Sequence, residues 1–170
     1  MYTIVQDGAE VLRQIAEPIR EEQFGTPELA TLVNGMSAAL DAEPDGVALA
    51  APQIGVSARI FIVRYDRLGP DYTGDALGVY INPEFVKSSR RQVEMDEGCL
   101  SVRGVYGKTI RHDRATLQAR TVDGKRFERG GGGILAQVFQ HEVDHLNGIL
   151  FSDHAHLVLE TTSEHSSHGE

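Results

Sequence analysis

Apolar residues recur at intervals of three and four in two stretches of the chain, as they do along one face of an α-helix. The first stretch consists of Leu29, Leu32, Val33, Met36 and Leu40. Thr26 supplies a capping hydroxyl and Pro27 a first-turn proline just before it, and the breaker segment 43–46 follows it. Between these signals we expect an amphipathic helix of about four turns.

The second stretch predicts a helix over residues 134–146. The glycine-rich segment 129–133 precedes this helix and is interpreted as a flexible breaker, and Gly148 is the expected stop. The apolar stripe of the helix consists of Ile134, Leu135, Val138, Phe139 and Leu146.

Short apolar runs between turn residues predict strands at 59–64 and 79–83, separated by a polar loop at 69–78, and a hairpin of 115–121 and 125–128 around Asp123-Gly124. The predicted fold class is α+β, with short antiparallel β-sheets packed around a central metal-binding α-helix at 134–146. We expect a single catalytic domain over residues 1–160. The polar, aperiodic segment 161–170 is expected to be a disordered tail.

Composition changes this picture mainly through charge and cysteine content. Of the 170 residues, 41% are hydrophobic and 24% are charged, which suits one domain with one core. The net charge of −9 argues against a nucleic-acid-binding protein and against an anionic membrane surface. The chain has one cysteine and no long apolar run. We therefore expect a cytoplasmic protein without disulfides, signal peptide or membrane span.

The segment His141-Glu142-Val143-Asp144-His145 carries the strongest chemical signal. Two histidines four residues apart lie on one helix face, so both imidazoles can reach a single cation. Glu142 lies roughly 100° further round the helix, where its carboxylate can act as a general base without binding the metal. The alternative is a solvated helix end, which the surrounding apolar residues disfavour.

The only cysteine lies in the segment Glu97-Gly98-Cys99-Leu100-Ser101. A lone cysteine is more often a small buried hydrophobic residue. The acidic residues before this one, however, disfavour a position in a packed apolar core. A thiolate would complete a three-ligand set with the two histidines and leave a fourth position open, as in catalytic zinc sites. A cysteine nucleophile paired with histidine is the rival interpretation.

A third segment, Gly46 to Gly55, is built from small residues between glycines, which allow a ligand to approach the backbone closely. It matches neither a phosphate-binding loop nor a dinucleotide fingerprint. Gln53 is its one polar side chain and can donate to an oxyanion. A tight turn before the strand at residue 59 is the simpler interpretation.

In this order, segments 46–55, 97–101 and 140–148 resemble the motifs GxGLAAxQxG, EGCLS and QHExDHLxG of the peptide deformylase family. Residues 11–13 and 17–19 also look like the opening of that family. The resemblance implies a metal-dependent hydrolase that removes the N-formyl group from N-formylmethionine at the start of newly made polypeptides and releases formate.

The resemblance also implies roles for individual residues. Cys99, His141 and His145 would bind the metal, and Glu142 would be the general base and acid. The Leu100 N–H and the Gln53 side chain would hold the oxyanion. The implied substrate-binding residues are Val47, Ala48, Gly98, Ile134 and Val138. An ion pair between Arg111 and Asp144 would hold the metal helix in place.

For cofactor and partners, the resemblance implies one divalent metal ion per chain, Fe²⁺ in the cell, with Zn²⁺ or Ni²⁺ substituting. The expected partners are N-formylmethionyl nascent peptides, and a transient ribosome contact is left open. We expect no nucleic-acid specificity and no membrane contact. The remaining histidines are not expected to bind this metal, namely His112, His154, His156, His165 and His168.

The chain departs from the family pattern at four places. Ala48 replaces a glycine, and we expect its methyl group to crowd the substrate and slow the reaction, unless the methyl points into the protein. Gln137 lies near the methionine pocket, where the family usually has an apolar residue. Arg103 stands where a proline commonly occurs, and the segment around Gly8 lacks the usual proline.

Two alternative functions remain at this point. A zincin-type peptidase would need a third metal ligand downstream, for which His154 and Glu160 are available, although neither lies on a convincing second helix. A deformylase-like protein of altered substrate preference or weak activity would follow from Ala48 and Gln137.

Overall fold

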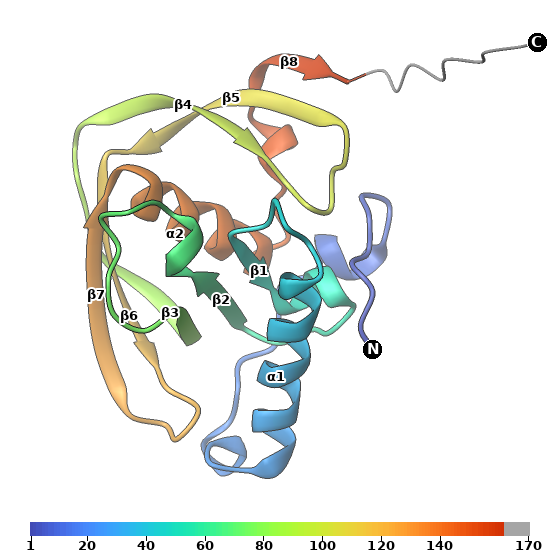
Figure 1. The fold of residues 1–170 in the computed structure, drawn as a ribbon, viewed down its shortest axis with the longest axis vertical. Coiled ribbons are helices and arrows are strands. Elements are labelled where there is room, and N and C mark those ends of the chain that lie inside the picture. The colour runs from blue at the N-terminus through green and yellow to red at the C-terminus, as the bar shows by residue number, and fades with distance from the viewer. Residues whose placement is uncertain (162–170) are drawn as a thin grey trace, which may run out of the picture.

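Two antiparallel sheets and two long helices organise the chain, which a computed structural model describes over residues 1–161 (Figure 1). The larger sheet has the strand order β1-β2-β3-β6-β7, with bounds Ala48–Ala50, Ile60–Arg64, Leu77–Ser88, Arg114–Arg120 and Arg126–Gly132. The smaller sheet has the order β4-β5-β8, with bounds Gln92–Gly98, Val105–His112 and His156–Glu160. The predicted α+β class is therefore confirmed.

Helix α1 (Pro27–Asp41) covers one face of the larger sheet. Its predicted start is confirmed, because the Thr26 hydroxyl oxygen accepts a hydrogen bond from the Leu29 N–H at 3.3 Å. The buried side of α1 packs against side chains from β1, β2 and β3, namely Leu49, Ile60, Ile62 and Ile81.

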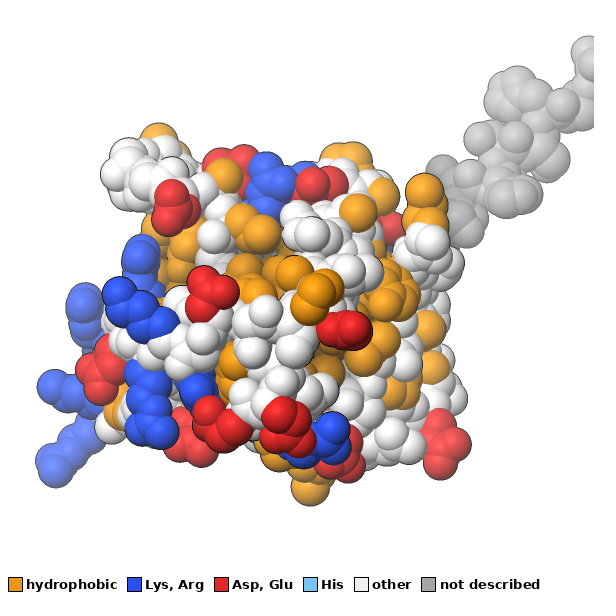
Figure 2. All heavy atoms as spheres, turned by 90° about the horizontal axis from the view of Figure 1, so that it is seen from below, with side chains coloured by type: hydrophobic (Ala, Val, Ile, Leu, Met, Phe, Trp, Pro, Cys, Tyr) orange, Lys and Arg blue, Asp and Glu red, His pale blue; other side chains and the backbone are white. Residues whose placement is uncertain are grey.

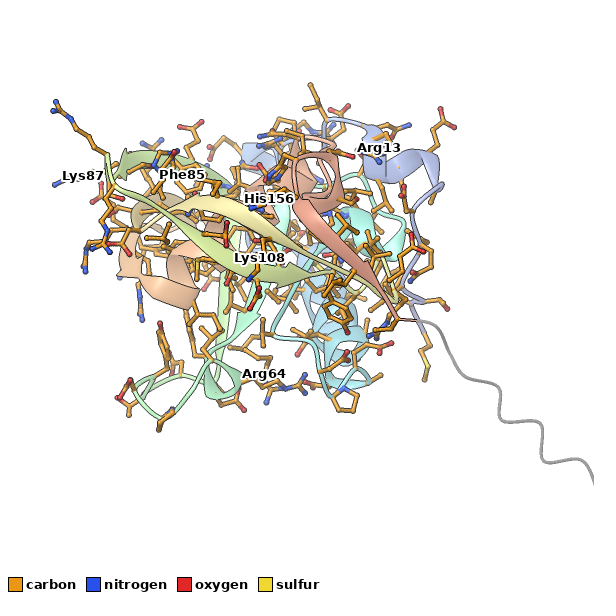
Figure 3. All side chains as sticks on the ribbon, turned by 90° about the horizontal axis from the view of Figure 1, so that it is seen from above. Arg13, Arg64, Phe85, Lys87, Lys108 and His156 are labelled. Atoms are coloured by element: carbon orange, nitrogen blue, oxygen red, sulfur yellow. The ribbon has the colours of Figure 1, made fainter. Side chains whose placement is uncertain are left out.

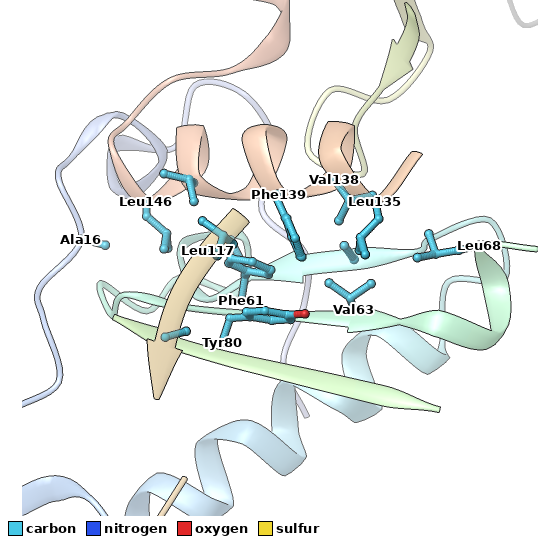
Figure 4. Packing of buried hydrophobic residues seen from close by; sticks show 14 residues of the cluster. Ala16, Phe61, Val63, Leu68, Tyr80, Leu117, Leu135, Val138, Phe139 and Leu146 are labelled. Atoms are coloured by element: carbon cyan, nitrogen blue, oxygen red, sulfur yellow. The ribbon is translucent and has the colours of Figure 1, made fainter. Parts of the chain in front are cut away.

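Helix α2 (Gly133–Leu146) covers the opposite face and confirms the second predicted helix. Phe61 and Tyr80 are stacked with ring centroids 4.6 Å apart, and Phe139 of α2 meets Tyr80 edge-on at 5.3 Å (Figure 4). Successive strand residues point to opposite faces, so β2 directs Ile60 and Ile62 to α1 and Phe61 and Val63 to α2. This double coverage explains why the predicted strand at 59–64 is apolar at almost every position.

The smaller sheet lies on the other side of α2, so that the helix runs between the two sheets (Figure 1). Its outer face carries charged pairs beside the exposed side chains of Tyr106 and Ile110. Lys108 and His156, both labelled in Figure 3, pair with Asp96 and Glu94 at 2.7 Å each. The inner face of this sheet therefore meets α2 and its outer face meets solvent.

Five short 3-10 helices connect these elements within residues 1–161, at Glu10–Arg13, Glu21–Gln23, Ala51–Ile54, Tyr65–Arg67 and Phe151–Asp153. At the end of the described chain, the Thr161 N–H donates to the Gly104 carbonyl at 2.7 Å. The rest of the predicted tail, 162–170, lies outside the described residues.

Over residues 1–161, neither helix is both long enough and apolar enough to cross a membrane. On the face shown in Figure 2, Lys and Arg side chains gather mainly towards one side, whereas Asp and Glu side chains are spread across it. The basic side chains, and not the acidic ones, are thus unevenly distributed on this face.

The segment 129–133 is not the flexible breaker that the sequence predicts, because residues 126–132 form strand β7. A side chain at Gly130 would meet the Thr116 hydroxyl at 2.8 Å, and one at Gly131 would meet Leu135 of α2 at 2.6 Å. These glycines therefore serve close packing. Only Gly133, with φ of 57°, turns the chain out of the strand and into the helix.

The predicted hairpin at 115–128 is confirmed as β6 and β7. The predicted strand at 79–83 is only the middle of β3, which continues through a register shift between Ile81 and Glu84. Asn82 lies in this shift with φ of 50°. Its side chain accepts from the Ile19 N–H and donates to the Ile19 carbonyl, both at 2.9 Å. The expected closing turn is therefore a bulge that anchors the N-terminal segment.

Asn82→Ala should destabilise the protein by about 2 kcal/mol, because it removes two hydrogen bonds and places alanine at a positive φ. Urea unfolding followed by circular dichroism measures this loss. The control is Asn34→Ala on the exposed side of α1, which should change the free energy of unfolding by less than about 0.5 kcal/mol. Equal effects in the two variants would contradict the anchoring role.

Candidate metal centre

Three potential metal ligands from two distant segments meet between the small sheet and α2. Cys99 follows the end of β4, and His141 and His145 lie one turn apart on α2. Their ligand atoms all lie within 4.8 Å of one another. The His145 Nε2 atom is 3.2 Å from the Cys99 Sγ atom and 3.2 Å from the His141 Nε2 atom.

These separations fit one tetrahedral divalent cation. Zinc distances of about 2.0–2.1 Å to nitrogen and about 2.3 Å to sulfur place two ligand nitrogens about 3.3 Å apart, and sulfur about 3.6 Å from nitrogen. Burial lowers the pKa of His145 well below its ordinary value, which favours the neutral ring that a metal binds. Within the described residues, no other His, Cys, Asp or Glu joins the cluster.

A buried carboxylate supports the first histidine. Glu97, at the end of β4, accepts a hydrogen bond from His141 Nδ1 at 3.0 Å, which leaves His141 Nε2 directed to the cluster. Burial alone would raise the pKa of Glu97, but hydrogen bonds from His141 and Arg111 hold it well below its usual range. Glu97 is therefore ionised and orients the imidazole.

Arg111 of β5 connects this carboxylate to the metal helix. Its Nε atom donates to Glu97 at 3.0 Å, and its Nη1 atom donates to Asp144 of α2 at 2.7 Å. Thr109, two residues earlier on β5, donates to Glu97 at 3.1 Å. The expected pair of Arg111 and Asp144 is thus present. Glu97 was not among the site residues expected from the sequence, although it opens the EGCLS segment.

Glu142 is buried beside the cluster, and its Oε2 atom has no hydrogen-bond partner among residues 1–161. Burial raises the pKa of Glu142 to about 7, so the carboxyl group can both take and return a proton near neutral pH. An unpartnered buried carboxylate oxygen is costly in a closed core. It fits a site that a water molecule or a substrate enters.

The two groups expected to hold the oxyanion lie on either side of the cysteine. The Gln53 Nε2 atom is 3.6 Å from Cys99 Sγ and 3.2 Å from the Ser101 hydroxyl, while its Oε1 atom accepts from the Ala50 N–H. The Leu100 N–H has no acceptor among the described residues. Both donors are thus held next to the ligand cluster.

A cavity of about 260 Å³ opens onto this cluster. All five residues expected to bind substrate line it, together with Cys99, Leu100, His141 and Glu142; the five are Val47, Ala48, Gly98, Ile134 and Val138. The residues expected from the sequence therefore line the cavity, although segments 46–55 and 97–101 are brought together only by the fold.

Three of the four departures from the family pattern line this cavity, namely Ala48, Gln137 and Arg103. Gln137 lines it and donates to the Asp96 carbonyl at 2.7 Å and to Glu97 at 3.2 Å. Arg103 pairs with Asp45 and Glu43, which links the two walls at the cavity rim.

Ala48 lines the cavity, but its side chain is mostly buried. It lies in β1 opposite Val63 and has no positive φ. Its side chain is buried in the cluster that contains Phe61 and Val138. The methyl group is therefore largely packed in the core, although Ala48 also lines the cavity, and this favours the alternative in which the methyl points into the protein.

The other histidines of residues 1–161 have different partners. His112 Nδ1 lies 2.7 Å from the Ser89 carbonyl, His154 lies 3.6 Å from Asp144, and His156 pairs with Glu94. His165 and His168 lie outside the described residues. Neither His154 nor Glu160 belongs to the cluster, so the third ligand of a zincin-type peptidase is not found there.

Comparison with known proteins gives one family. The family profile described as Polypeptide deformylase matches residues 1–159. The chain belongs to the peptide deformylase family. A peptide deformylase of Carboxydothermus hydrogenoformans is 40% identical over 155 residues, which are 91% of this chain and 93% of that one. One of Thermomicrobium roseum is 45% identical over 157 residues, 89% of this chain and 84% of that one.

A solved structure agrees with this membership. The Met-Ala-Ser-bound class I type b peptide deformylase of Acinetobacter baumannii has a TM-score of 0.81 and 34% sequence identity, covering 89% of this chain and 97% of that chain. As a member of the family, the chain is a metal-dependent deformylase, and its Cys99, His141 and His145 form a cluster suited to one metal ion.

Replacing a metal ligand should lower the metal content of the protein, whereas replacing the general base should leave it unchanged. Cys99→Ala should lose most of its bound zinc or iron, because two imidazoles alone hold a divalent ion weakly. Glu142→Ala, the matched control, should keep about one ion per chain. Elemental analysis after gel filtration measures both contents. Full occupancy in an inactive Cys99→Ala variant would favour a nucleophilic cysteine instead.

Ala48→Gly should leave kcat/KM on formyl-Met peptides within about twofold of the parent value, because the methyl group is mostly packed in the core. The free energy of unfolding should fall by about 0.5–1 kcal/mol, since glycine weakens a strand. Initial rates and urea unfolding measure the two quantities. A large gain in kcat/KM would mean that the methyl does reach the substrate.

Proposed function

We propose that the cluster of Cys99, His141 and His145 holds one divalent ion, at which Glu142 removes the formyl group from N-formylmethionyl peptides. The observation that carries this proposal is the buried, unpartnered oxygen of Glu142 next to three converging ligands. A bound divalent ion lowers the pKa of a water molecule and polarises a carbonyl group.

The cavity supplies binding and orientation. Val47, Ile134 and Val138 provide apolar surface on opposite walls, which suits the unbranched thioether side chain of methionine. The formyl carbonyl would then lie at the part of the cavity that Leu100 and Gln53 line, within reach of the Leu100 N–H and the Gln53 amide. These donors stabilise the negative charge that develops on the carbonyl oxygen.

Glu142 moves the proton. Its carboxylate takes a proton from the attacking water as the new carbon–oxygen bond forms. It then delivers that proton to the amine nitrogen as the carbon–nitrogen bond breaks, so that formate and a free α-amino group result. A pKa of about 7 is suited to both transfers. Arg111 and Glu97 hold His141 in place during these steps.

We further propose Fe²⁺ as the native ion, with Zn²⁺ or Ni²⁺ able to replace it, because one thiolate and two imidazoles suit borderline cations. The proposed setting is the cytoplasm, where N-formylmethionyl chains are made. A transient ribosome contact belongs to the same proposal, without nucleic-acid specificity and without a membrane. The Acinetobacter baumannii enzyme bound to Met-Ala-Ser supports a peptide with an N-terminal methionine as the product.

Release of formate from a formyl-Met peptide tests the proposal, and Glu142→Ala should reduce kcat roughly 10²–10⁴-fold with the metal retained, since general base catalysis contributes about that much. Formate dehydrogenase coupled to NADH detection measures the rate. Cleavage of an internal peptide bond by the parent protein, or near-normal turnover of Glu142→Ala, would contradict the assignment.

A further inference from the structure

The N-terminal segment Val5–Asp7 lies against both elements that carry the proposed oxyanion donors. The Val5 N–H donates to the Gln53 carbonyl at 2.8 Å, and the Asp7 N–H donates to the Ser101 carbonyl at 2.8 Å. Residues far apart in the sequence are thus joined by the start of the chain, which runs beside the short helix Ala51–Ile54 (Figure 1).

Gln6 lies between these two contacts, and both the nitrogen and the oxygen of its side-chain amide hydrogen-bond to the same turn. Its Nε2 atom donates to the Leu100 carbonyl at 2.9 Å, and its Oε1 atom accepts from the Arg103 N–H at 3.3 Å. The side chain therefore spans the turn from Leu100 to Arg103. No other side chain within residues 1–161 hydrogen-bonds to the Leu100 carbonyl.

Among the described residues, hydrogen bonds of this turn also involve Cys99, Ser101 and Val102, and they leave the Leu100 N–H free. Within it, the Val102 N–H donates to the Cys99 carbonyl at 3.1 Å, and the Ser101 N–H lies 3.4 Å from Cys99 Sγ. The direction of the free Leu100 N–H depends on how the peptide groups of this turn are oriented. A hydrogen bond to the Leu100 carbonyl restrains the next peptide group and, through it, the φ and ψ angles of Leu100.

We propose that Gln6 is a positioning residue for deformylation, which holds the Leu100 N–H towards the formyl oxygen by bridging Leu100 and Arg103. The inference rests on the proposed function. Gln6 itself is exposed and lines no part of the cavity, so it acts through the turn and touches no reacting atom. Donors aimed at developing charge contribute mainly in the transition state, so the effect belongs in kcat.

Gln6→Met keeps the length of the side chain and removes both hydrogen bonds. It should lower kcat on a formyl-Met-Ala-Ser peptide roughly five- to twentyfold, as expected for one or two hydrogen bonds of ordinary strength. The KM and the metal content should stay close to the parent values, and the melting temperature should fall by no more than about 5 °C, because Gln6 is exposed. Gln6→Glu keeps only the acceptor for the Arg103 N–H and sets a carboxylate against the Leu100 carbonyl, so it should be at least as slow.

The matched control is Gln14→Leu, an exposed glutamine without a side-chain hydrogen bond among residues 1–161, which should keep the parent kcat. An unchanged kcat in Gln6→Met would overturn the inference. So would a loss shared by kcat, metal content and melting temperature, because that pattern means a structural tether alone. If the parent protein releases no formate, the proposed function itself fails, and that result is distinct from both of these.

Discussion

The buried carboxylate of Glu97 is the contact on which the site depends. It accepts hydrogen bonds from Arg111 and Thr109 of β5 and from His141 of α2, so one anion joins the small sheet to α2. A buried charge without partners costs several kcal/mol, whereas a fully hydrogen-bonded one is tolerated. Glu97 therefore selects a single arrangement in which Cys99, two residues further on, meets the imidazoles.

The two apolar clusters make this arrangement rigid. The larger sheet is covered by α1 on one face and α2 on the other, and the stacked Phe61 and Tyr80 lie directly under Phe139. Close packing of this kind leaves α2 little freedom to rotate. The inward face of the helix then presents His141, Glu142 and His145 in fixed positions, which is what a pre-organised site requires.

The sequence predicted both helices, the ligand set and the cavity-lining residues, because helical spacing and the motifs are local signals. It did not predict β5, because the buried positions of that strand carry Gly107, Thr109 and Arg111 while Tyr106 and Ile110 are exposed. A strand that faces a polar site inverts the usual alternation. From the sequence alone, the glycines of β7 predict a flexible segment. Their role in close packing follows only from the positions of Thr116 and Leu135 in the fold. The contacts of Gln6 with residue 100 depend on tertiary structure, which no periodicity encodes.

The origin of the three ligands in separate substructures has a thermodynamic consequence. Cys99 follows the last strand residue of β4 in the small sheet, whereas His141 and His145 lie on α2, which packs against the large sheet. A cation held by all three closes a cross-link between them, so local opening of the small sheet requires release of the ion. Metal concentration thereby enters the opening equilibrium as RT ln(1 + [M]/Kd). With an ion bound by these three residues, metal supply would add to the stability of the closed form as well as to the fraction of chains able to turn over substrate.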